Sequence, residues 1–267
     1  MTQPIIKIFK KIKNIVWAFF KRRTWDHLVI HRRKLTENPP SLALPLLCGH
    51  AKGKLRCPPE ITILLLHNYA HPPIMELSLQ YVGITYYHVL KLNAGEPWRQ
   101  TKKISMLLNY LKNADCKADY ILYCDSNDSV LRDNPEKAIR YLEEENCDLL
   151  FSRTKSKDNY KYMPEQKIWT DQIAKDNGFY SQWYINAGVF FGRTAFLREV
   201  LQAALFYVTD NDLIGEKYKK LRQSGKLLEQ LPEFPKGCGS DQTILRYLHP
   251  QFYPRMKIDY RGRLALR

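Results

Sequence analysis

Two carboxylates three positions apart are the residues of this chain best suited to chemistry. Residues 120–131 read YILYCDSNDSVL, so a strand-prone, mostly apolar run leads directly into Asp125 and Asp128. Two carboxylates on a tight turn repel each other, and burial raises that cost. A divalent ion removes the repulsion, and Mg²⁺ or Mn²⁺ is typically held by one or two carboxylates together with water and substrate phosphates. The turn therefore predicts an ion that carries a diphosphate; a solvated turn of Asp, Asn and Ser is the alternative.

The usual phosphate-binding loops are missing from the sequence. It contains no GxxxxGK[ST] stretch, and no GxGxxG follows the first predicted strand. An α/β protein that handles phosphates without these loops depends more strongly on a metal ion.

Hydrophobic patterning indicates the elements that must position this turn. Short apolar runs predict strands over residues 61–69, 84–90, 119–124, 147–152 and 184–192. Helical spacing predicts helices over 99–113, 134–145, 193–208 and 239–249, and residues 256–266 predict a final strand or extended tail. This alternation predicts an α/β fold with a mostly parallel sheet flanked by helices, in which ligands gather at the carboxyl ends of the strands.

Between two of these strands, residues 153–183 are polar and aromatic with little periodicity. A loop of this length in a compact domain is usually a lid or a binding loop. We therefore expect this segment to close over the substrate and exclude water.

Basic residues gather at the N-terminus. Ten Lys and Arg against one Asp between Met1 and Lys34 contribute +9 of the formal net charge of +15. Apolar residues recur there at helical spacing, so residues 1–35 predict a basic amphipathic helix. Residues 1–23 fit an anionic membrane interface, and packing on this or another protein is the alternative.

The five prolines within residues 36–60 predict a linker, which leaves residues 61–267 as the α/β domain. No apolar run approaches the roughly 20 residues needed to cross a bilayer. The scattered cysteines form no CxxC pair and indicate a reducing compartment. We therefore expect a cytoplasmic protein, peripheral at the inner face of a membrane if the N-terminal helix binds lipid. Because the excess of basic residues is concentrated outside the domain, no nucleic-acid partner is expected.

Four further stretches join YILYCDSNDSVL in an ordered set of motifs. They are EPWRQTKKISMLLNYL (96–111), YINAGVFFG (184–192), GSDQTIL (239–245) and KIDYRGRLAL (257–266). Together they resemble the GT-A nucleotide-sugar glycosyltransferases, in particular the glycosyltransferase domain of the lysyl hydroxylase and procollagen galactosyltransferase group. The resemblance runs from about Ile61 to the C-terminus. It implies a Rossmann-like GT-A fold, a UDP-sugar donor and a Mn²⁺ (or Mg²⁺) cofactor.

The resemblance also implies roles for individual residues at the donor site. Asp125 and Asp128 would hold Mn²⁺ bridging the UDP phosphates. Lys103 would contact the phosphates or the donor sugar, and Trp98 would wall the donor site. A core position for Trp98 and a solvated one for Lys103 are the alternatives.

Further implied roles lie near the sugar. Asn186, Ala187 and Gly188 would line the donor sugar or its junction with the acceptor, where a small residue lets substrate approach the backbone. Asp241, at the start of its helix, would bind the donor sugar or act as the base. Alternatively Asp241 only caps the helix, with Ser240 as the rival cap.

Two departures from the family matter. Relatives with a collagen-type site carry a histidine after the C-terminal aspartate as third metal ligand, and Tyr260 stands there in this chain. We therefore predict Asp259 as the replacement ligand, since a carboxylate oxygen suits Mn²⁺. The family's acidic residue after the fourth strand is also missing from FSRT (151–154), so a collagen-like acceptor is not expected.

The sequence thus predicts a metal-dependent glycosyltransferase that moves a sugar from a UDP-sugar to a glycan, lipid-linked or protein acceptor. A metal-dependent nucleotidyltransferase or phosphoesterase is one alternative, because these enzymes also use paired aspartates. A non-catalytic protein that binds anionic lipid or nucleic acid through its basic N-terminus is another.

Overall fold

The structure is a computed structural model of the 267-residue chain. It describes residues 27–32, 35, 39–93, 96–113, 116–157, 159–179, 182–209, 224 and 235–266. The helix expected within residues 1–35 falls mostly outside these described residues.

The helices and strands follow the order expected from the sequence, with several additions. The strands are β1 (Val29–His31), β2 (Ile61–Leu66), β3 (His88–Leu90), β4 (Tyr120–Cys124), β5 (Ser129–Leu131), β6 (Leu149–Thr154), β7 (Tyr184–Arg193), β8 (Met256–Ile258) and β9 (Ala265–Leu266). The α-helices are α2 (Pro40–Cys48), α3 (Ile74–Val82), α4 (Lys102–Lys112), α5 (Lys137–Glu145), α6 (Pro164–Asp176), α7 (Thr194–Leu205) and α9 (Asp241–Phe252). Single 3₁₀ turns are η2 (Gly49–Ala51) and η3 (Tyr160–Tyr162).

The larger sheet is mixed rather than purely parallel. Its strand order is β3-β2-β4-β7-β6-β8. The pairs β2–β3, β2–β4 and β6–β8 are parallel, whereas β7 runs antiparallel to both β4 and β6. The sequence predicted the α/β class correctly, but it did not indicate the antiparallel strand. The reason is that β7 is buried along nearly its whole length, so its apolar run looks like that of any central strand.

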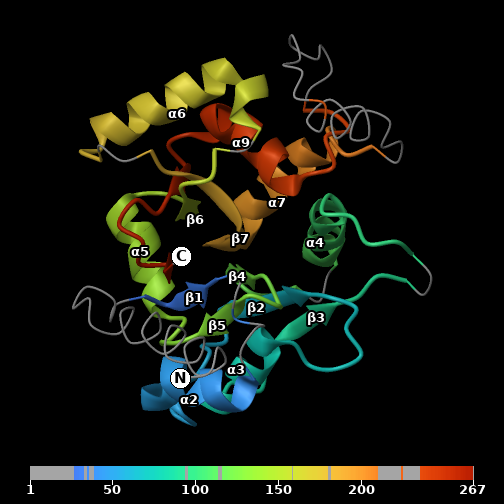
Figure 1. Ribbon diagram of the computed structural model, residues 1–267, viewed down its shortest axis with the longest axis vertical. Coiled ribbons are helices and arrows are strands. Elements are labelled where there is room, and N and C mark those ends of the chain that lie inside the picture. Colours follow the sequence, from blue (N-terminus) through green and yellow to red (C-terminus); the bar gives the residue numbers. More distant parts are fainter. Residues whose placement is uncertain are drawn as a thin grey trace, which may run out of the picture.

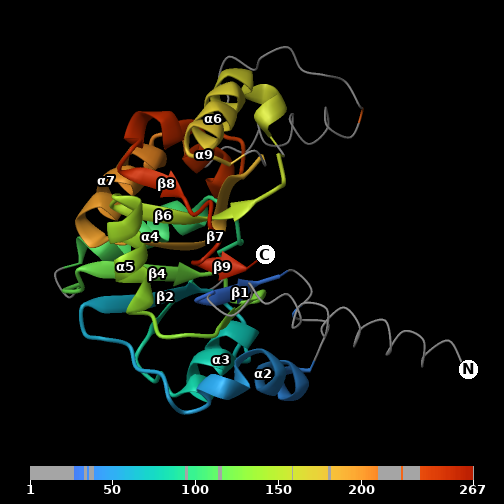
Figure 2. The same cartoon turned by 90° about the vertical axis from the view of Figure 1, so that its left-hand side faces the viewer.

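Helices cover both faces of this sheet (Figure 1). One apolar core lies between the sheet and helices α2, α3 and α5, and a second lies between the sheet and helices α4, α7 and α9. Alternate residues of β4 serve the two cores: Leu122 and Cys124 face the first, and Ile121 and Tyr123 face the second. Helix α6 packs against α9 on the outside (Figure 2). The sheet is thus buried on both faces, and its polar residues concentrate at strand ends.

A second, small sheet joins three distant parts of the chain. Its order is β5-β1-β9, with β1 antiparallel to β5 and parallel to β9. Strand β1 is buried, and Val29 within it and Leu28 just before it belong to the first core. Residues 27–31 therefore belong to the same folded body as the α/β domain, although the sequence placed them in a separate N-terminal segment.

The segment predicted as a linker, residues 36–60, is partly helical. Helix α2 and turn η2 occupy residues 40–51, and Ala43, Leu44 and Cys48 are buried in the first core. Pro40 stands in the first turn of α2, where the missing N–H costs nothing. The prolines suggested an irregular segment, but one of them starts a packed helix.

Residues 153–183, predicted to be an irregular loop, contain regular secondary structure instead. Strand β6 extends to Thr154, and η3 and α6 follow before β7 begins. Only Thr170 and Ala174 of α6 are buried, so the sequence of this helix lacks the apolar periodicity from which a helix is predicted. Ion pairing between Lys167 and Asp171, one turn apart, supports it instead.

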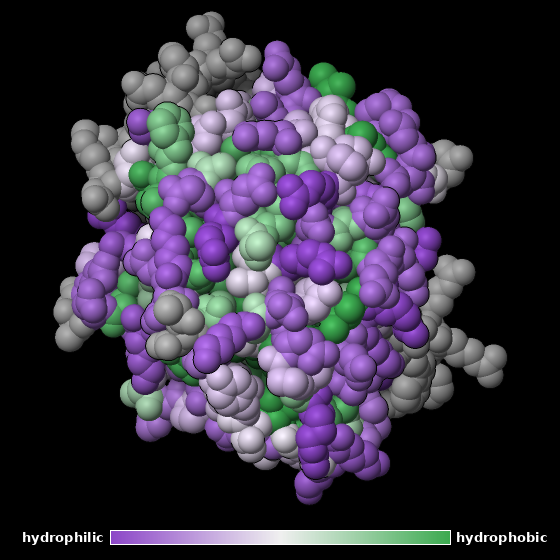
Figure 3. Space-filling model, turned by 180° about the vertical axis from the view of Figure 1, so that it is seen from behind, coloured by the Kyte–Doolittle hydropathy of each residue, from purple (hydrophilic) through white to green (hydrophobic). Residues whose placement is uncertain are grey.

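Hydrophilic side chains cover most of the face seen in Figure 3, and hydrophobic ones appear there only as small scattered patches. Among the described residues, no helix is both long enough and apolar enough to cross a bilayer.

Candidate metal centre

A cleft of about 870 Å³ opens at the carboxyl end of β4, at the centre of the sheet. Both predicted metal ligands, Asp125 and Asp128, line it. So do the other predicted site residues apart from Asp259, namely Trp98, Lys103, Asn186, Ala187, Gly188 and Asp241. Chain segments that are far apart in the sequence therefore converge where the sequence analysis expected a ligand.

The turn between β4 and β5 presents the two carboxylates. It is anchored by Ser126, whose hydroxyl donates to the Leu66 carbonyl at 3.2 Å and whose carbonyl accepts from the Met75 N–H at 3.0 Å. With the middle of the turn tied down, Asp125 and Asp128 project into the cleft while the adjoining strands stay buried.

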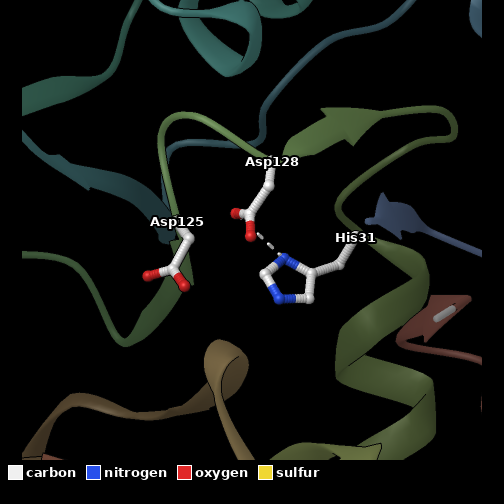
Figure 4. Close-up of side chains that lie close together, drawn as sticks. All are labelled: His31, Asp125 and Asp128. Carbon is white, nitrogen blue, oxygen red and sulfur yellow. Dashed lines mark ion pairs between the residues drawn. The ribbon is translucent and has the colours of Figure 1, made fainter. Parts of the chain in front are cut away.

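A histidine completes a group that could hold a metal ion. One potential ligand atom each from His31, Asp125 and Asp128 lies within 4.8 Å of the other two. Figure 4 shows the side chains converging from β1 and from the turn after β4. The His31 Nδ1 atom lies 3.4 Å from Asp128 Oδ1 and 2.8 Å from the Ser129 hydroxyl.

The absence of a side chain at Gly188 keeps the space between Asp125 and His31 open. A Cβ atom there would lie 2.6 Å from Asp125 Oδ2 and 2.7 Å from His31 Nε2. Both atoms therefore border the space over Gly188, and a methyl group would fill it. The backbone is held in place because Asp125 N–H donates to the Gly188 carbonyl at 2.7 Å.

An irregularity in β7 aims these residues at the cleft. Phe151 pairs with Phe190, but the next residue of β6, Ser152, pairs with Asn186, so three residues of β7 are passed over. The Asn186 side chain, itself buried, accepts from the Gly188 N–H at 2.7 Å and stabilises the bulge. Bulges of this kind often redirect side chains next to active sites.

Comparison with protein-family models gives no match for this chain, and comparison with curated protein sequences gives none either. What the cleft can do must therefore be argued from its residues.

Lys103 links the metal group to the start of helix α9. Its Nζ lies 3.2 Å from Asp125 Oδ1 and 2.8 Å from Asp241 Oδ2, and it donates to the Ala187 carbonyl at 3.2 Å. Burial alone would lower the pKa of this amine, but the two carboxylates outweigh it and hold the pKa well above its usual value. A permanent positive charge thus lies beside the two aspartates, so the solvated position considered for Lys103 is wrong.

Asp125 uses its two oxygens differently. The Tyr123 hydroxyl donates to Oδ1 at 3.1 Å, and the Lys103 amine contacts the same oxygen. The other oxygen, Oδ2, borders the space over Gly188. The carboxylate is thereby turned so that Oδ2 faces His31.

Ser240, and not Asp241, is the residue that caps helix α9. Its side chain accepts from the Thr243 N–H at 3.3 Å. Asp241 is therefore not needed as the cap, and its carboxylate turns toward Lys103 although the residue is only 5% exposed. The next residue, Gln242, accepts from the Ala187 N–H at 3.3 Å, which ties the helix start to β7.

Aromatic side chains line the end of the cleft near β2. His67 and Tyr69 stack with ring centroids 5.5 Å apart, and the Tyr69 hydroxyl accepts from the Asn127 amide at 2.9 Å. Tyr69 and Trp98 are each about half exposed, so Trp98 is not a core residue. Neither His67 nor Tyr69 was expected at the site, although both lie at the end of the first predicted strand, residues 61–69, and follow β2 in the structure.

The structure does not bring Asp259 to the metal group. This residue is fully buried after β8, and its carboxylate accepts from the Gly262 N–H at 3.0 Å and the Leu264 N–H at 2.5 Å. Both oxygens are occupied by the backbone of their own turn. Asp259 therefore lies outside the group that could hold a metal ion, in which His31 is the third residue.

Proposed function

We propose that this protein is a metal-dependent glycosyltransferase that takes a sugar from a UDP-sugar. The observation that carries the proposal is the joint placement of an open Asp125–Asp128 pair and a buried Lys103–Asp241 pair in one cleft. The first pair suits a divalent ion, and the second suits the polar substrate that such an ion would hold.

The residues fit a divalent ion on two grounds. Two carboxylates and an imidazole converge within 4.8 Å, and the space between Asp125 and His31 lies over a glycine whose Cβ would block it. Asp125, Asp128 and His31 are the residues available to hold Mn²⁺. When bound, such an ion supplies positive charge that stabilises the departing diphosphate of a sugar nucleotide.

Lys103 supplies a second positive charge close to the same place. Its amine is buried and lies between Asp125 and Asp241, so it does not swing freely as a surface lysine does. A fixed ammonium in a cleft of reduced solvent access attracts phosphate oxygens without needing to be reoriented. This accords with the phosphate contact that the resemblance implies for Lys103.

Asp241 and the β7 bulge are placed to meet the sugar. The Asp241 carboxylate accepts hydrogen bonds from sugar hydroxyls, and the open backbone at Ala187 and Gly188 lets the ring come close. Asn186 contributes by holding the bulge, since its side-chain oxygen is engaged by the Gly188 N–H. We therefore assign Asp241 to the donor sugar or to the base, and Asn186 to positioning.

The aromatic end of the cleft suits the nucleobase. Tyr69 presents about half of its surface, is backed by His67, and is tethered to Asn127 of the metal turn. A base stacked on Tyr69 would place its diphosphate toward Asp125 and Asp128. Stacking on an aromatic ring contributes about 1–3 kcal/mol per base.

We also propose that the fold is of the GT-A type. A mixed sheet with a carboxylate turn at its central strand and a helix start facing it is compatible with the GT-A architecture. The proposed acceptor is a glycan, a lipid-linked molecule or a protein, which would enter from the open side of the cleft.

The test is a thermal-shift screen of UDP-, GDP- and dTDP-sugars with and without Mn²⁺, followed by turnover assays on any nucleotide that stabilises the chain. We expect Mn²⁺-dependent stabilisation by UDP-sugars and release of UDP. The double variant Asp125→Asn/Asp128→Asn should lose both while remaining folded. Full activity in that variant, or cleavage within the diphosphate to release UMP, would overturn the proposal.

A further inference from the structure

We propose that His31 Nε2 is the third protein ligand of the metal ion, so that strand β1 of the N-terminal segment completes the centre. The inference rests on the divalent-ion part of the proposed function. It goes further because it places a ligand in a segment that the sequence motifs do not include, and because it makes the centre depend on the pairing of β1.

The imidazole ring of His31 is oriented with Nε2 toward the space beside Asp125. Of its two nitrogens, Nε2 lies beside the space over Gly188 that Asp125 Oδ2 also borders, as the positions around a Gly188 Cβ show. Nδ1 lies toward Asp128 (Figure 4), and the Ser129 hydroxyl is 2.8 Å from it. The ring thus presents Nε2 to the space over Gly188 beside Asp125 and uses Nδ1 for support.

The contacts of Nδ1 suit one tautomer of the His31 imidazole. A carboxylate oxygen can only accept a hydrogen bond, so a ring that donates toward Asp128 does so with its proton on Nδ1. Ser129, whose hydroxyl lies 2.8 Å from the same Nδ1, can accept as well. Nε2 then keeps its lone pair, which is the form of imidazole that binds metals.

Backbone hydrogen bonds fix strand β1 to the turn that carries Asp125 and Asp128. His31 pairs with Ser129 and Ile30 pairs with Val130 in the antiparallel ladder of β1 and β5. The Arg32 N–H donates to the Asp128 carbonyl at 2.6 Å. His31 is 4% exposed, so its ring has little freedom to leave the group.

The proposed ligand set, one imidazole and two carboxylates, limits which metal ion fits the site. Mg²⁺ prefers an octahedron of oxygen ligands, whereas an imidazole nitrogen suits transition metals. One nitrogen and two carboxylates therefore favour Mn²⁺ over Mg²⁺. A further consequence is that metal affinity and the pairing of β1 with β5 and β9 depend on each other, because His31 reaches the ion only when β1 is in place.

The experiment measures Mn²⁺ alone bound to the full chain, without any nucleotide. Electron spin-echo spectroscopy of the bound Mn²⁺ should detect coupling to a histidine nitrogen, and growth on ¹⁵N-histidine should change that coupling in the expected way. In His31→Gln the coupling should vanish and the Mn²⁺ affinity should fall by about 10–100-fold or more. His67→Gln, which alters another histidine of the cleft, should leave the nitrogen coupling as in the wild type.

The outcomes separate the possibilities. Nitrogen coupling that persists in His31→Gln, or bound Mn²⁺ in the wild type without histidine coupling, would overturn the inference even if UDP-sugar turnover is found. Loss of coupling in His67→Gln together with its survival in His31→Gln would transfer the ligand role to His67 and overturn it as well. Coupling to His31 in a protein that turns over no sugar nucleotide would support the inference and contradict only the proposed function. If His31→Gln does not fold, histidine coupling in the wild type that persists in His67→Gln supports the inference, and absence of that coupling in the wild type overturns it.

Discussion

Two turns of this protein each carry an aspartate just after a strand, and they use it in opposite ways. Asp125 follows β4, borders a cleft, and shares one oxygen with Lys103 and Tyr123 while the other faces His31. Asp259 follows β8, is fully buried, and gives its oxygens to two backbone N–H groups of its own turn.

The difference shows that motif position does not decide what a carboxylate does. Both aspartates fell within stretches that resemble metal-binding motifs, yet only one has an oxygen directed at other potential ligands. An aspartate followed by a glycine in a tight turn has backbone donors within reach, and in Asp259 these donors are used. The residues around an aspartate determine whether it binds a metal or stabilises a turn.

The largest effect that tests this comparison is expected for Asp125→Asn. Losing the charge of one metal-facing carboxylate should remove Mn²⁺-dependent stabilisation and lower turnover by about 10²–10³-fold. Asp259→Asn is the matched control and should still bind Mn²⁺. The comparison would fail if the two variants lost Mn²⁺ affinity equally, as measured by electron spin resonance of free Mn²⁺.

Gly188→Ala should have the next largest effect. Its new Cβ would lie 2.6 Å from Asp125 Oδ2, so the carboxylate or His31 has to move. A displacement of this size at a reacting centre can cost about 10²-fold in turnover. Gly192→Ala is a useful control on the same strand, because its Cβ would meet Leu149 and the Asp148 carbonyl instead.

The two glycine variants should therefore fail in different assays. We expect Gly188→Ala to lose Mn²⁺ affinity with a small change in melting temperature, and Gly192→Ala to lose melting temperature while any folded protein still binds Mn²⁺. Normal Mn²⁺ affinity in Gly188→Ala would show that the space over this glycine is not where the ion binds.

Asp259→Asn should act mainly on stability. One of the two buried N–H groups that Asp259 accepts from would face an amide NH₂ and lose its partner, at a cost of about 1–3 kcal/mol in the free energy of unfolding. For a chain of this length that corresponds to a fall in melting temperature of about 2–4 °C per kcal/mol. Urea denaturation of Asp259→Asn beside Asp125→Asn measures the difference directly. A smaller loss in Asp259→Asn than in Asp125→Asn would contradict the structural role.

The sequence indicated the Asp125 turn and its cleft but missed His31, and both outcomes have physical reasons. Strand β4 and its turn have a strong local pattern, as do β7 and the start of α9, so the cleft and most of its lining could be expected. His31 could not, because β1 has only three residues and gains its stability from pairing with β5 and β9. Ser129, which positions the His31 ring, lies 98 residues away in the chain.

Asp259 was wrongly predicted as a metal ligand because the sequence does not show which aspartates accept hydrogen bonds from the backbone. The sequence DYRGR shows an aspartate and a glycine three residues later, which suits a turn as well as a metal motif. Only the geometry shows that the Gly262 and Leu264 N–H groups point at the carboxylate. Short-range patterns therefore predicted the elements, while long-range pairing decided which polar residues form the site.

The smallest expected effect concerns the pH dependence of stability. Burial raises the pKa of Asp259 above its ordinary value of 3.8, against the opposing effects of the Leu264 N–H, Arg263 and Arg153. The folded chain therefore holds this proton more tightly than the unfolded chain does. The contribution of Asp259 to the free energy of unfolding is fully present below pH 3.8 and declines as pH rises from there through the raised pKa.

Asp259→Asn has no titrating carboxyl group at this position. The free energy of unfolding of the wild type minus that of the variant should therefore fall as pH rises over that window. Urea titrations of both proteins at a series of pH values measure the slope, and proton release by other carboxylates cancels in the difference. A difference that grows with pH would mean that the hydrogen bonds from Gly262 and Leu264 to the charged carboxylate outweigh its burial. The turn after β8 would then favour a charged carboxylate, and burial alone would no longer distinguish Asp259 from Asp125.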